Sequence, residues 1–335
     1  MIARSDIPHF LMRSKVKGCA CSYDYRFVLD CEGVLWYGDR RSDELKLHNQ
    51  ELPQCTSVIA NRLMVALLDV SGHVWIADYH RSRKSTLLFH YFPGLEEIVS
   101  VALYDSYQPE VVRTDSGESR SVHLDMLALS SSGITYRAST KMNVIVEMEG
   151  PIFEYIDADE ICAGLDSAGD LYTWGGGKTL EKIDVSDVAV MDFIVEGKCI
   201  KYLDLEGKLW KYPLSEDNRI TFQLFKDVPP FQLLYGSGKH GFALSNAGEL
   251  WGWGQNNQKQ LGIEFNPFVP VPRKIECEQL WKFICCKDDV SLLISQEGDV
   301  YQWGRCTRSG KGAMFKIENI KQAYVDKVYS KSARK

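Results

Sequence analysis

The sequence predicts an all-β protein, a seven-bladed β-propeller made of four-stranded antiparallel blades. Three observations predict it. One turn-and-aromatic pattern recurs seven times, the residues flanking each copy alternate between apolar and polar with a period of two, and no window carries a sustained helical stripe of apolar residues. A hairpin-bearing unit repeated at roughly 40 to 50 residues is typical of a propeller blade.

Each copy of the repeat contains an aliphatic residue, Asp or Ser, two free positions, Gly and, three positions later, Trp or Tyr. The Asp or Ser side chain can accept a hydrogen bond from the backbone N–H two residues on, and Gly suits a turn whose exit needs a positive φ. We expect the aromatic rings, Trp251 among them, to pack in the core between neighbouring blades and to contribute more stability than the cysteines. The seven pairs are Gly33 and Trp36, Gly72 and Trp75, Gly133 and Tyr136, Gly169 and Tyr172, Gly207 and Trp210, Gly248 and Trp251, and Gly298 and Tyr301.

Closure of the ring involves the two ends of the chain. The repeat glycines lie 39, 61, 36, 38, 41 and 50 residues apart, so seven units fit between the termini. Residues 7–11 and 316–320 both resemble the outer strand that ends a repeat, and either could complete the last blade. Propellers usually close by pairing their two ends in one blade, so we expect the termini to lie close together.

The sixth copy carries a family resemblance. It reads Gly-Lys-His-Gly-Phe-Ala-Leu from Gly238, Gly-Glu-Leu-Trp-Gly-Trp-Gly-Gln-Asn-Asn from Gly248, and Gln-Leu-Gly from Gln260. This segment resembles the repeat of the regulator-of-chromosome-condensation family almost position by position, and the likeness extends over residues 16–328, which makes the chain similar to a divergent member. The resemblance implies a propeller fold and, as a function, guanine-nucleotide exchange on a Ran-type small GTPase. Only the sixth copy keeps the histidine His240 and the Gln-Leu-Gly end.

Charge is distributed unevenly along the chain. The net charge is −6 and the pI about 5.7, so the body is not built to bind a polyanion. We expect a basic N-terminal arm over 1–15, which could also supply the outer strand of the closing blade, the propeller over 16–328 and a basic tail over 329–335. Contacts with nucleic acid or an acidic protein surface are predicted for Arg4, Arg13, Lys15, Lys17, Lys331, Arg334 and Lys335. Solvated chain ends are the alternative interpretation.

No motif in the sequence predicts catalysis, a cofactor or a metal. The ten cysteines are scattered without a Cys-x-x-Cys pair. The run from Gly175 to Thr179 resembles the end of a phosphate-binding loop, but Tyr172 stands where that loop needs its first glycine, so a blade loop is expected. His240 is expected to order an inner strand. Without a signal peptide or an apolar span, we expect a reduced, monomeric, intracellular protein, cytoplasmic or nuclear, with no membrane segment.

One polar insertion interrupts the repeat. Residues 104–121 lie between expected strands at 98–103 and 124–129, within the 61-residue gap. Insertions in repeat proteins fall in loops on one face, often the binding face. The predicted partner-contacting residues are Tyr104, Asp105, Tyr107, Arg113 and Arg120. A disordered excursion is the other interpretation.

Three functions remain open from the sequence. The chain is predicted to be a non-enzymatic protein-interaction scaffold that presents loops on one propeller face. The first alternative is a guanine-nucleotide exchange factor for a Ran-type GTPase, and the second is a chromatin or nucleosome binder acting through the basic tails. The corresponding partners are an unidentified protein, a small GTPase or a nucleosome.

Overall fold

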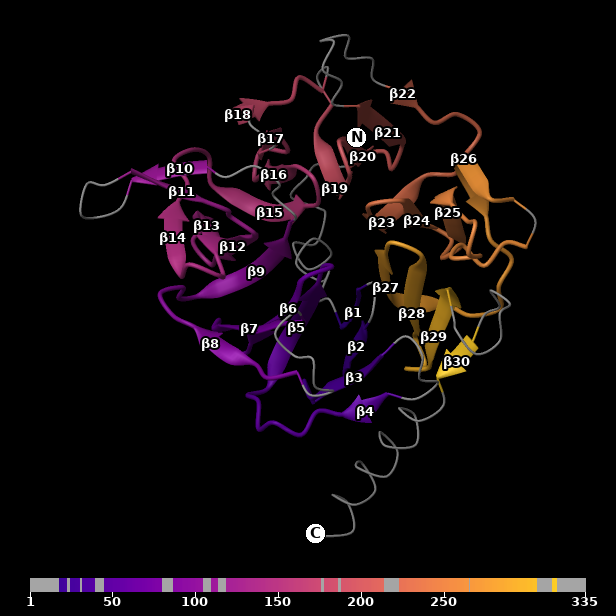
Figure 1. Ribbon diagram of the computed structural model, residues 1–335. Helices are drawn as coiled ribbons and strands as arrows, with labels where there is room; N and C mark the ends of the chain where they lie inside the picture. Colours follow the sequence, from indigo (N-terminus) through magenta and orange to yellow (C-terminus); the bar gives the residue numbers. More distant parts are fainter. Residues whose placement is uncertain are drawn as a thin grey trace, which may run out of the picture.

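Seven blades surround a central axis in the computed structural model of the chain (Figure 1). The residues that the structure describes are 18–22, 25–30, 32–39, 45–79, 87–104, 110–113, 119–175, 178–185, 188–213, 223–264, 266–305 and 315–317. Every blade is a four-stranded antiparallel sheet, and no helix occurs within these ranges. The predicted all-β, seven-bladed propeller is confirmed.

Each blade is formed by four strands in chain order, from the axis outward. Blade one contains β1 (Cys19–Cys21), β2 (Tyr25–Leu29), β3 (Leu35–Asp39) and β4 (Lys46–Leu47). Blade two contains β5 (Cys55–Ala60), β6 (Met64–Asp69), β7 (Val74–Asp78) and β8 (His90–Phe92). Blade three contains β9 (Ile98–Leu103), β12 (Met126–Ser130), β13 (Thr135–Ser139) and β14 (Val144–Glu147). The hairpin of β10 (Glu110–Arg113) and β11 (Ser119–Val122) interrupts blade three between its first two strands.

The remaining blades repeat the same order. Blade four contains β15 (Phe153–Ala158), β16 (Cys162–Asp166), β17 (Leu171–Gly175) and β18 (Lys178–Lys182). Blade five contains β19 (Val190–Glu196), β20 (Cys199–Asp204), β21 (Leu209–Pro213) and β22 (Gln223–Leu224). Blade six contains β23 (Phe231–Ser237), β24 (His240–Ser245), β25 (Leu250–Gln255) and β26 (Phe268–Lys274). Blade seven contains β27 (Trp281–Lys287), β28 (Val290–Ser295), β29 (Val300–Gly304) and β30 (Phe315–Ile317).

All seven repeat turns join the second and third strands of their blades. Each turn glycine has a positive φ, between 71° and 88°. Gly207 also shows a close approach to the next blade, because a Cβ there would lie 2.5 Å from the carbonyl oxygen of Phe231. That residue's N–H donates to the Gly207 carbonyl at 2.8 Å, so the turn fixes where the next blade begins.

The aspartate of the repeat explains the position of the tryptophan. In blade two, Oδ1 of Asp69 accepts the N–H groups of Ser71 and His73, while Oδ2 accepts the indole N–H of Trp75 at 3.0 Å. The same indole bond joins Trp36 to Asp30 at 3.1 Å and Trp210 to Asp204 at 2.9 Å. The sequence pattern therefore records one hydrogen-bonded unit, a link that reasoning from the sequence did not identify.

Most repeat aromatics are half-buried rather than fully buried. Trp251 belongs to this group, and Tyr301, at 8% exposed, is the buried exception. Three of the deeply buried tryptophans occupy the position two residues later, where Trp174 and Trp253 are 3% exposed and Trp303 is 2% exposed; Trp281, 4% exposed, instead begins β27. The expectation that the Trp251 ring lies in the core is wrong, because Trp251 is the second residue of β25 and lies beside the surface turn.

The ring closes where blade seven meets blade one. β30 pairs with β29, so the C-terminal candidate segment supplies the outer strand of blade seven, whereas residues 7–11 lie outside the described ranges. Within those ranges blade one and blade seven are each formed from four consecutive strands, and no strand is shared between them. β1 packs directly on β27 and β28. The seam core includes Cys19, Val28, Leu292 and Ile294. Buried Arg26 of β2 crosses the seam to donate to the side-chain oxygen of Gln302 in β29.

Candidate functional site

The innermost strands of all seven blades line a cavity of about 110 Å³ at the centre of the ring. These strands are β1, β5, β9, β15, β19, β23 and β27. Most of the lining is apolar, with Ile59, Leu103 and Ile194 as examples. Lys287, at the end of β27, is one of the few charged lining residues. We call the cavity the central channel, and its polar end at Lys287 the channel mouth.

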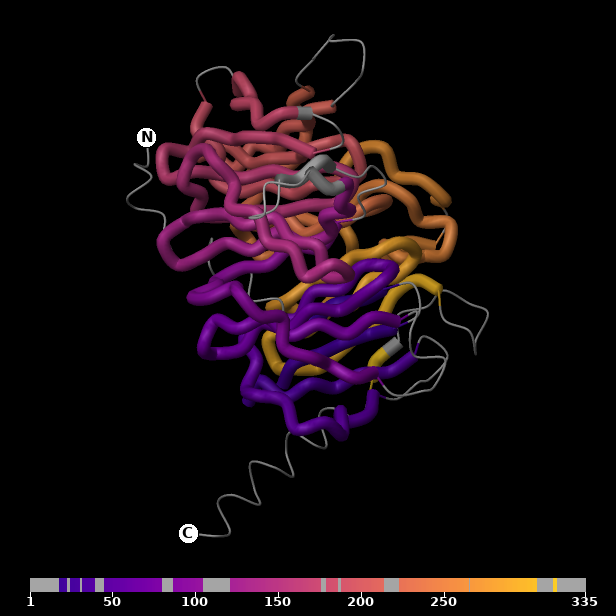
Figure 2. The backbone as a smooth tube through the Cα atoms, turned by 60° about the vertical axis from the view of Figure 1, so that its left-hand side comes forward, coloured from indigo at the N-terminus to yellow at the C-terminus, as the bar shows by residue number. Residues whose placement is uncertain are grey.

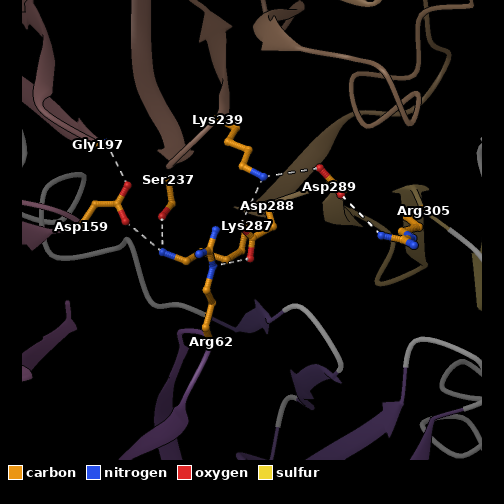
Figure 3. Close-up of polar contacts among 9 residues, drawn as sticks. All are labelled: Arg62, Asp159, Gly197, Ser237, Lys239, Lys287, Asp288, Asp289 and Arg305. Atoms are coloured by element: carbon orange, nitrogen blue, oxygen red, sulfur yellow. Dashed lines mark hydrogen bonds and ion pairs between the residues drawn. The ribbon is translucent and has the colours of Figure 1, made fainter. Parts of the chain in front are cut away.

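One face of the propeller carries the connections between first and second strands, and we call it the inner-turn face. Because each blade starts with its innermost strand running in the same direction, these connections gather around one mouth of the channel. Charged side chains from four blades meet there, as Figure 3 shows. The channel-mouth cluster comprises Arg62, Asp159, Lys239, Lys287, Asp288, Asp289 and Arg305.

Lys287 and Asp159 form the buried part of this cluster. The Lys287 Nζ lies 3.1 Å from Oδ1 of Asp159 and 3.0 Å from Oγ of Ser237. Oδ2 of Asp159 accepts the N–H of Gly197 at 2.9 Å. The Lys287 and Asp159 side chains are only 8% and 10% exposed, so this network joins blades four to seven at the mouth.

Arg62 and Asp288 form the outer part. The Arg62 guanidinium binds Asp288 through two bonds, at 2.6 Å and 3.3 Å, and so connects blade two to blade seven. Burial opposes ionisation of the Asp288 carboxyl, but the bond and charge of Arg62 outweigh it and lower its pKa below the usual range. Lys239 lies 3.8 Å from Asp288, and Arg305 lies 3.9 Å from Asp289.

The geometry of the cluster suits recognition more than chemistry. Each of its three carboxylates already pairs with at least one cation. The rim cations remain partly open to solvent, with the side chains of Arg62, Arg305 and Lys239 47%, 42% and 37% exposed. No group of three or more metal-ligating side chains is found in the described part of the chain.

The β10–β11 hairpin also belongs to the inner-turn face. It connects the first and second strands of blade three, with Glu110 opposite Val122 and Arg113 opposite Ser119. In Figure 1 the hairpin lies at the rim of the ring beside blade three, and Figure 2 shows the same ring turned by 60°. Val122 and Leu124, 1% and 0% exposed, anchor its base in the core.

The predicted partner-contacting residues have different locations. Tyr104 is 5% exposed and packs in the core near Trp174, so its assignment to a contact surface is corrected. It is the residue directly after an inner strand, and the polar sequence that follows it concealed this burial. Arg113 and Arg120 lie in the hairpin strands. Asp105 and Tyr107 fall outside the described residues, as do Arg4, Arg13, Lys15, Lys17, Lys331, Arg334 and Lys335.

His240 has a structural role between blades six and seven. It begins β24, the second strand of its blade, rather than an inner strand as expected. Its Nε2 lies 2.7 Å from Oγ of Ser291, and that hydroxyl donates to the carbonyl of Gln260 at 2.6 Å. Burial lowers the pKa of His240 to about 3, which keeps the ring neutral.

The Gly175–Thr179 run has no phosphate-binding geometry in its described part. Gly175 ends β17, and Lys178 begins β18 of the same blade, so a strand follows where a phosphate-binding loop needs a helix. The expected blade loop is confirmed. Among the described residues, no helix is long and apolar enough to cross a membrane.

Reasoning from the sequence missed the channel-mouth cluster. Its members are separated by up to 243 positions, from Arg62 to Arg305, and only ring closure brings them together. A signal was nevertheless present, because Arg62, Asp159 and Asp288 each follow an apolar inner strand within two residues. Charges recurring at that position would have indicated a polar channel mouth.

Solved propellers match the fold over most of its length. The crystal structure of human WBSCR16 superposes with a TM-score of 0.64 at 14% identity, covering 83% of this chain and 86% of that one. A crystal structure of Prp20p from Saccharomyces cerevisiae, studied for its binding properties to Gsp1p and histones, gives a TM-score of 0.63 at 14% identity, covering 92% and 85%. Yeast RCC1 (Prp20) bound to Kap60 gives 0.62 at 13% identity, covering 87% and 81%. At these identities the likeness concerns the fold.

Sequence relatives match over shorter regions. Human probable E3 ubiquitin-protein ligase HERC4 is 35% identical over 77 residues, 22% of this chain and 7% of the relative. The guanine nucleotide exchange factor SRM1 of Saccharomyces cerevisiae is 27% identical over 183 residues, 44% of this chain and 38% of the relative. In both cases the match spans less than half of the relative. No protein-family model matches the chain.

The chain is a seven-bladed β-propeller, and its fold is similar to that of yeast RCC1 (Prp20). The repeat at 238–262 adds a resemblance in sequence to the regulator-of-chromosome-condensation repeat.

Proposed function

We propose that this propeller is a protein-interaction scaffold that binds its partner on the inner-turn face. The observation that carries the proposal is the presence of two distinctive features on that one face, the channel-mouth cluster and the β10–β11 hairpin. A partner that covers this face would meet exposed Arg62 and Arg305 together with the hairpin. Arginine is enriched among residues that dominate binding energy.

The charge of the site suggests the chemistry of the partner. The channel-mouth cluster holds four cationic and three acidic side chains, although the chain carries a net charge of −6. The three acidic side chains are only 7% to 16% exposed, whereas those of Arg62, Lys239 and Arg305 are 37% to 47% exposed, so these three cations dominate the surface that the solvent meets. A protein surface bearing carboxylates fits such a mouth, since arginine binds carboxylates through two parallel hydrogen bonds.

Shortening the hairpin tests this proposal. Replacing residues 107–118 with a short Gly-Ser linker keeps Tyr104, Val122 and Leu124, so the blade should stay folded, because loop length changes cost little entropy. The partner would be identified by affinity capture with the full chain, and its dissociation constant then measured by calorimetry. We expect binding about tenfold weaker or worse, with an unchanged melting temperature. Equal affinity would remove the hairpin from the binding surface.

Guanine-nucleotide exchange is the second candidate. It is favoured by the likeness to SRM1, named as an exchange factor, and to Prp20p, studied for its binding to Gsp1p. Exchange requires the protein to stabilise the nucleotide-free GTPase, which the inner-turn face could do by inserting a loop. The chromatin alternative relies on basic termini outside the described residues.

A nucleotide-release assay separates exchange from scaffolding. Catalytic amounts of the chain would be added to a Ran-type GTPase loaded with a fluorescent guanine nucleotide. We expect the release rate to stay at its uncatalysed value, because the copy in blade six matches the family repeat most completely, those in blades four and seven match only half of it, and the remaining copies retain only the turn and the aromatic. An acceleration by orders of magnitude would make exchange the function and the inner-turn face its first candidate surface.

A further inference from the structure

Four cysteines gather where the ring closes. Cys19 and Cys21 lie in β1, and Cys285 and Cys286 lie in β27, the inner strand of blade seven. The Sγ atoms of Cys21 and Cys285 are 3.4 Å apart, although the two residues are separated by 264 positions. None of these four cysteines forms a disulfide in the structure.

The seam between blades one and seven lacks a covalent connection between neighbouring blades within the described chain. At each of the other six junctions the chain runs directly from one blade into the next, so those neighbours are covalently connected. Blades one and seven lie at opposite ends of the described chain, and no strand is exchanged between them there. A cross-link at this seam would therefore close a loop that contains nearly the whole propeller.

We propose that Cys21 and Cys285 are an oxidation site, a thiol pair that converts to a disulfide and fastens the seam. Cys285 lines the central channel and is partly exposed, whereas Cys21 is fully buried beside it. Small oxidants that enter the channel would reach Cys285 first, and Cys21 would then act as the resolving thiol.

The chemistry balances with a peroxide as oxidant. The Cys285 thiol is oxidised by hydrogen peroxide to a sulfenic acid, and one water leaves. The Cys21 sulfur then attacks the sulfenic sulfur, an S–S bond forms, and the hydroxyl leaves with the Cys21 proton as a second water. Two thiols lose two electrons, and the peroxide is reduced to two waters.

The surroundings favour this pairing over others. Cys19 and Cys21 each direct a thiol to a backbone carbonyl, that of Leu292 at 3.8 Å and that of Val290 at 3.7 Å, but Cys21 also lies 3.4 Å from the sulfur of Cys285. Cys286 is buried, at 5% exposed. The bond to Cys285, together with burial, holds the pKa of Cys21 well above that of an ordinary thiol. Cys21 therefore stays protonated and unreactive until Cys285 has been oxidised.

Two reciprocal double variants test the pair. The variant Cys19→Ala with Cys286→Ala keeps the proposed pair, and the variant Cys21→Ala with Cys285→Ala removes it while keeping the other two thiols. Each full-length protein would be treated with hydrogen peroxide, alkylated, digested with trypsin and examined by mass spectrometry. We expect a cross-linked peptide that joins residues 18–26 to residues 283–287 in the wild type and in the first variant only, and its loss after reduction.

Thermal unfolding gives a second, independent readout. Because a cross-link over so long a loop constrains the unfolded chain strongly, oxidation should raise the melting temperature of the first variant by about 4 °C or more. The second variant should show no such shift. A cross-link that persists without Cys21 and Cys285, or its absence from the folded wild type after oxidation, would overturn the proposal. Should a variant fail to fold, fragmentation of the wild-type cross-linked peptide still assigns the bonded cysteines.

Discussion

Replacing Trp253 with alanine should lower the free energy of unfolding by about 3–5 kcal/mol, the range for removing a fully buried large aromatic side chain. Trp253 is 3% exposed and packs with Leu203 and Phe231 between blades five and six. Its indole N–H donates to Oε1 of Glu196 at 2.8 Å, and the other carboxylate oxygen of Glu196 pairs with buried Lys201. The substitution therefore leaves both a cavity and a weakened polar network.

Trp251 supplies the matched control, because it lies on the same strand two residues earlier. It is half-buried, and its ring meets Phe231 edge-on. Trp251→Ala should therefore cost clearly less than Trp253→Ala. Denaturant unfolding of both variants and the wild type measures the difference. Equal losses would show that the repeat position contributes as much to the core as the position two residues later, which contradicts this account.

Acidification should destabilise the wild type through His240. The ordinary pKa of 6.5 falls to about 3 on folding because of burial. Between these values the unfolded chain binds a proton that the native chain does not, so stability is full above pH 6.5 and decreases as the pH falls toward 3. The loss attributable to His240 should be about 2 kcal/mol between pH 7 and pH 5.

The variant His240→Gln isolates this contribution. It removes the titrating ring, so its unfolding free energy should fall less than that of the wild type over the same interval. Exposed His90, changed to glutamine, is the matched surface control. Denaturant midpoints at pH 7 and pH 5 provide the comparison. Identical pH slopes for the wild type and His240→Gln would contradict a buried, neutral histidine.

The fold could be predicted because its determinants are local. An Asp or Ser, a glycine with positive φ and an aromatic residue occur within seven positions, and each copy specifies one hairpin by itself. Counting the copies gave the number of blades. The burial of each aromatic side chain was not predictable in the same way. Trp251 and Trp253 point to the same side of β25, but only Trp253 is buried, where it contacts Glu196 of the neighbouring blade.

The candidate site could not be predicted from the sequence in the same way, because the residues that form it are far apart in the chain. Arg62 and Asp288 meet only when blades two and seven are brought around the axis. Tyr104 was misassigned for a related reason, since its polar neighbours suggested a surface loop although the chain alternation places it in the core. The insertion itself was located correctly, between the first two strands of blade three.

The most direct test of the proposed function compares two surface cations on opposite faces of the propeller. Arg62 lies on the inner-turn face with its side chain 47% exposed, and Lys208 follows a repeat turn on the other face with its side chain 52% exposed. Both side chains form an ion pair, Arg62 with buried Asp288 and Lys208 with exposed Glu206, so the stability of each alanine variant is measured first. The dissociation constant of the captured partner would be measured with both variants and the wild type, after confirming equal melting temperatures. Binding on the inner-turn face predicts an affinity about tenfold lower for Arg62→Ala and unchanged for Lys208→Ala; a loss confined to Lys208→Ala would place the partner on the opposite face and contradict the proposal.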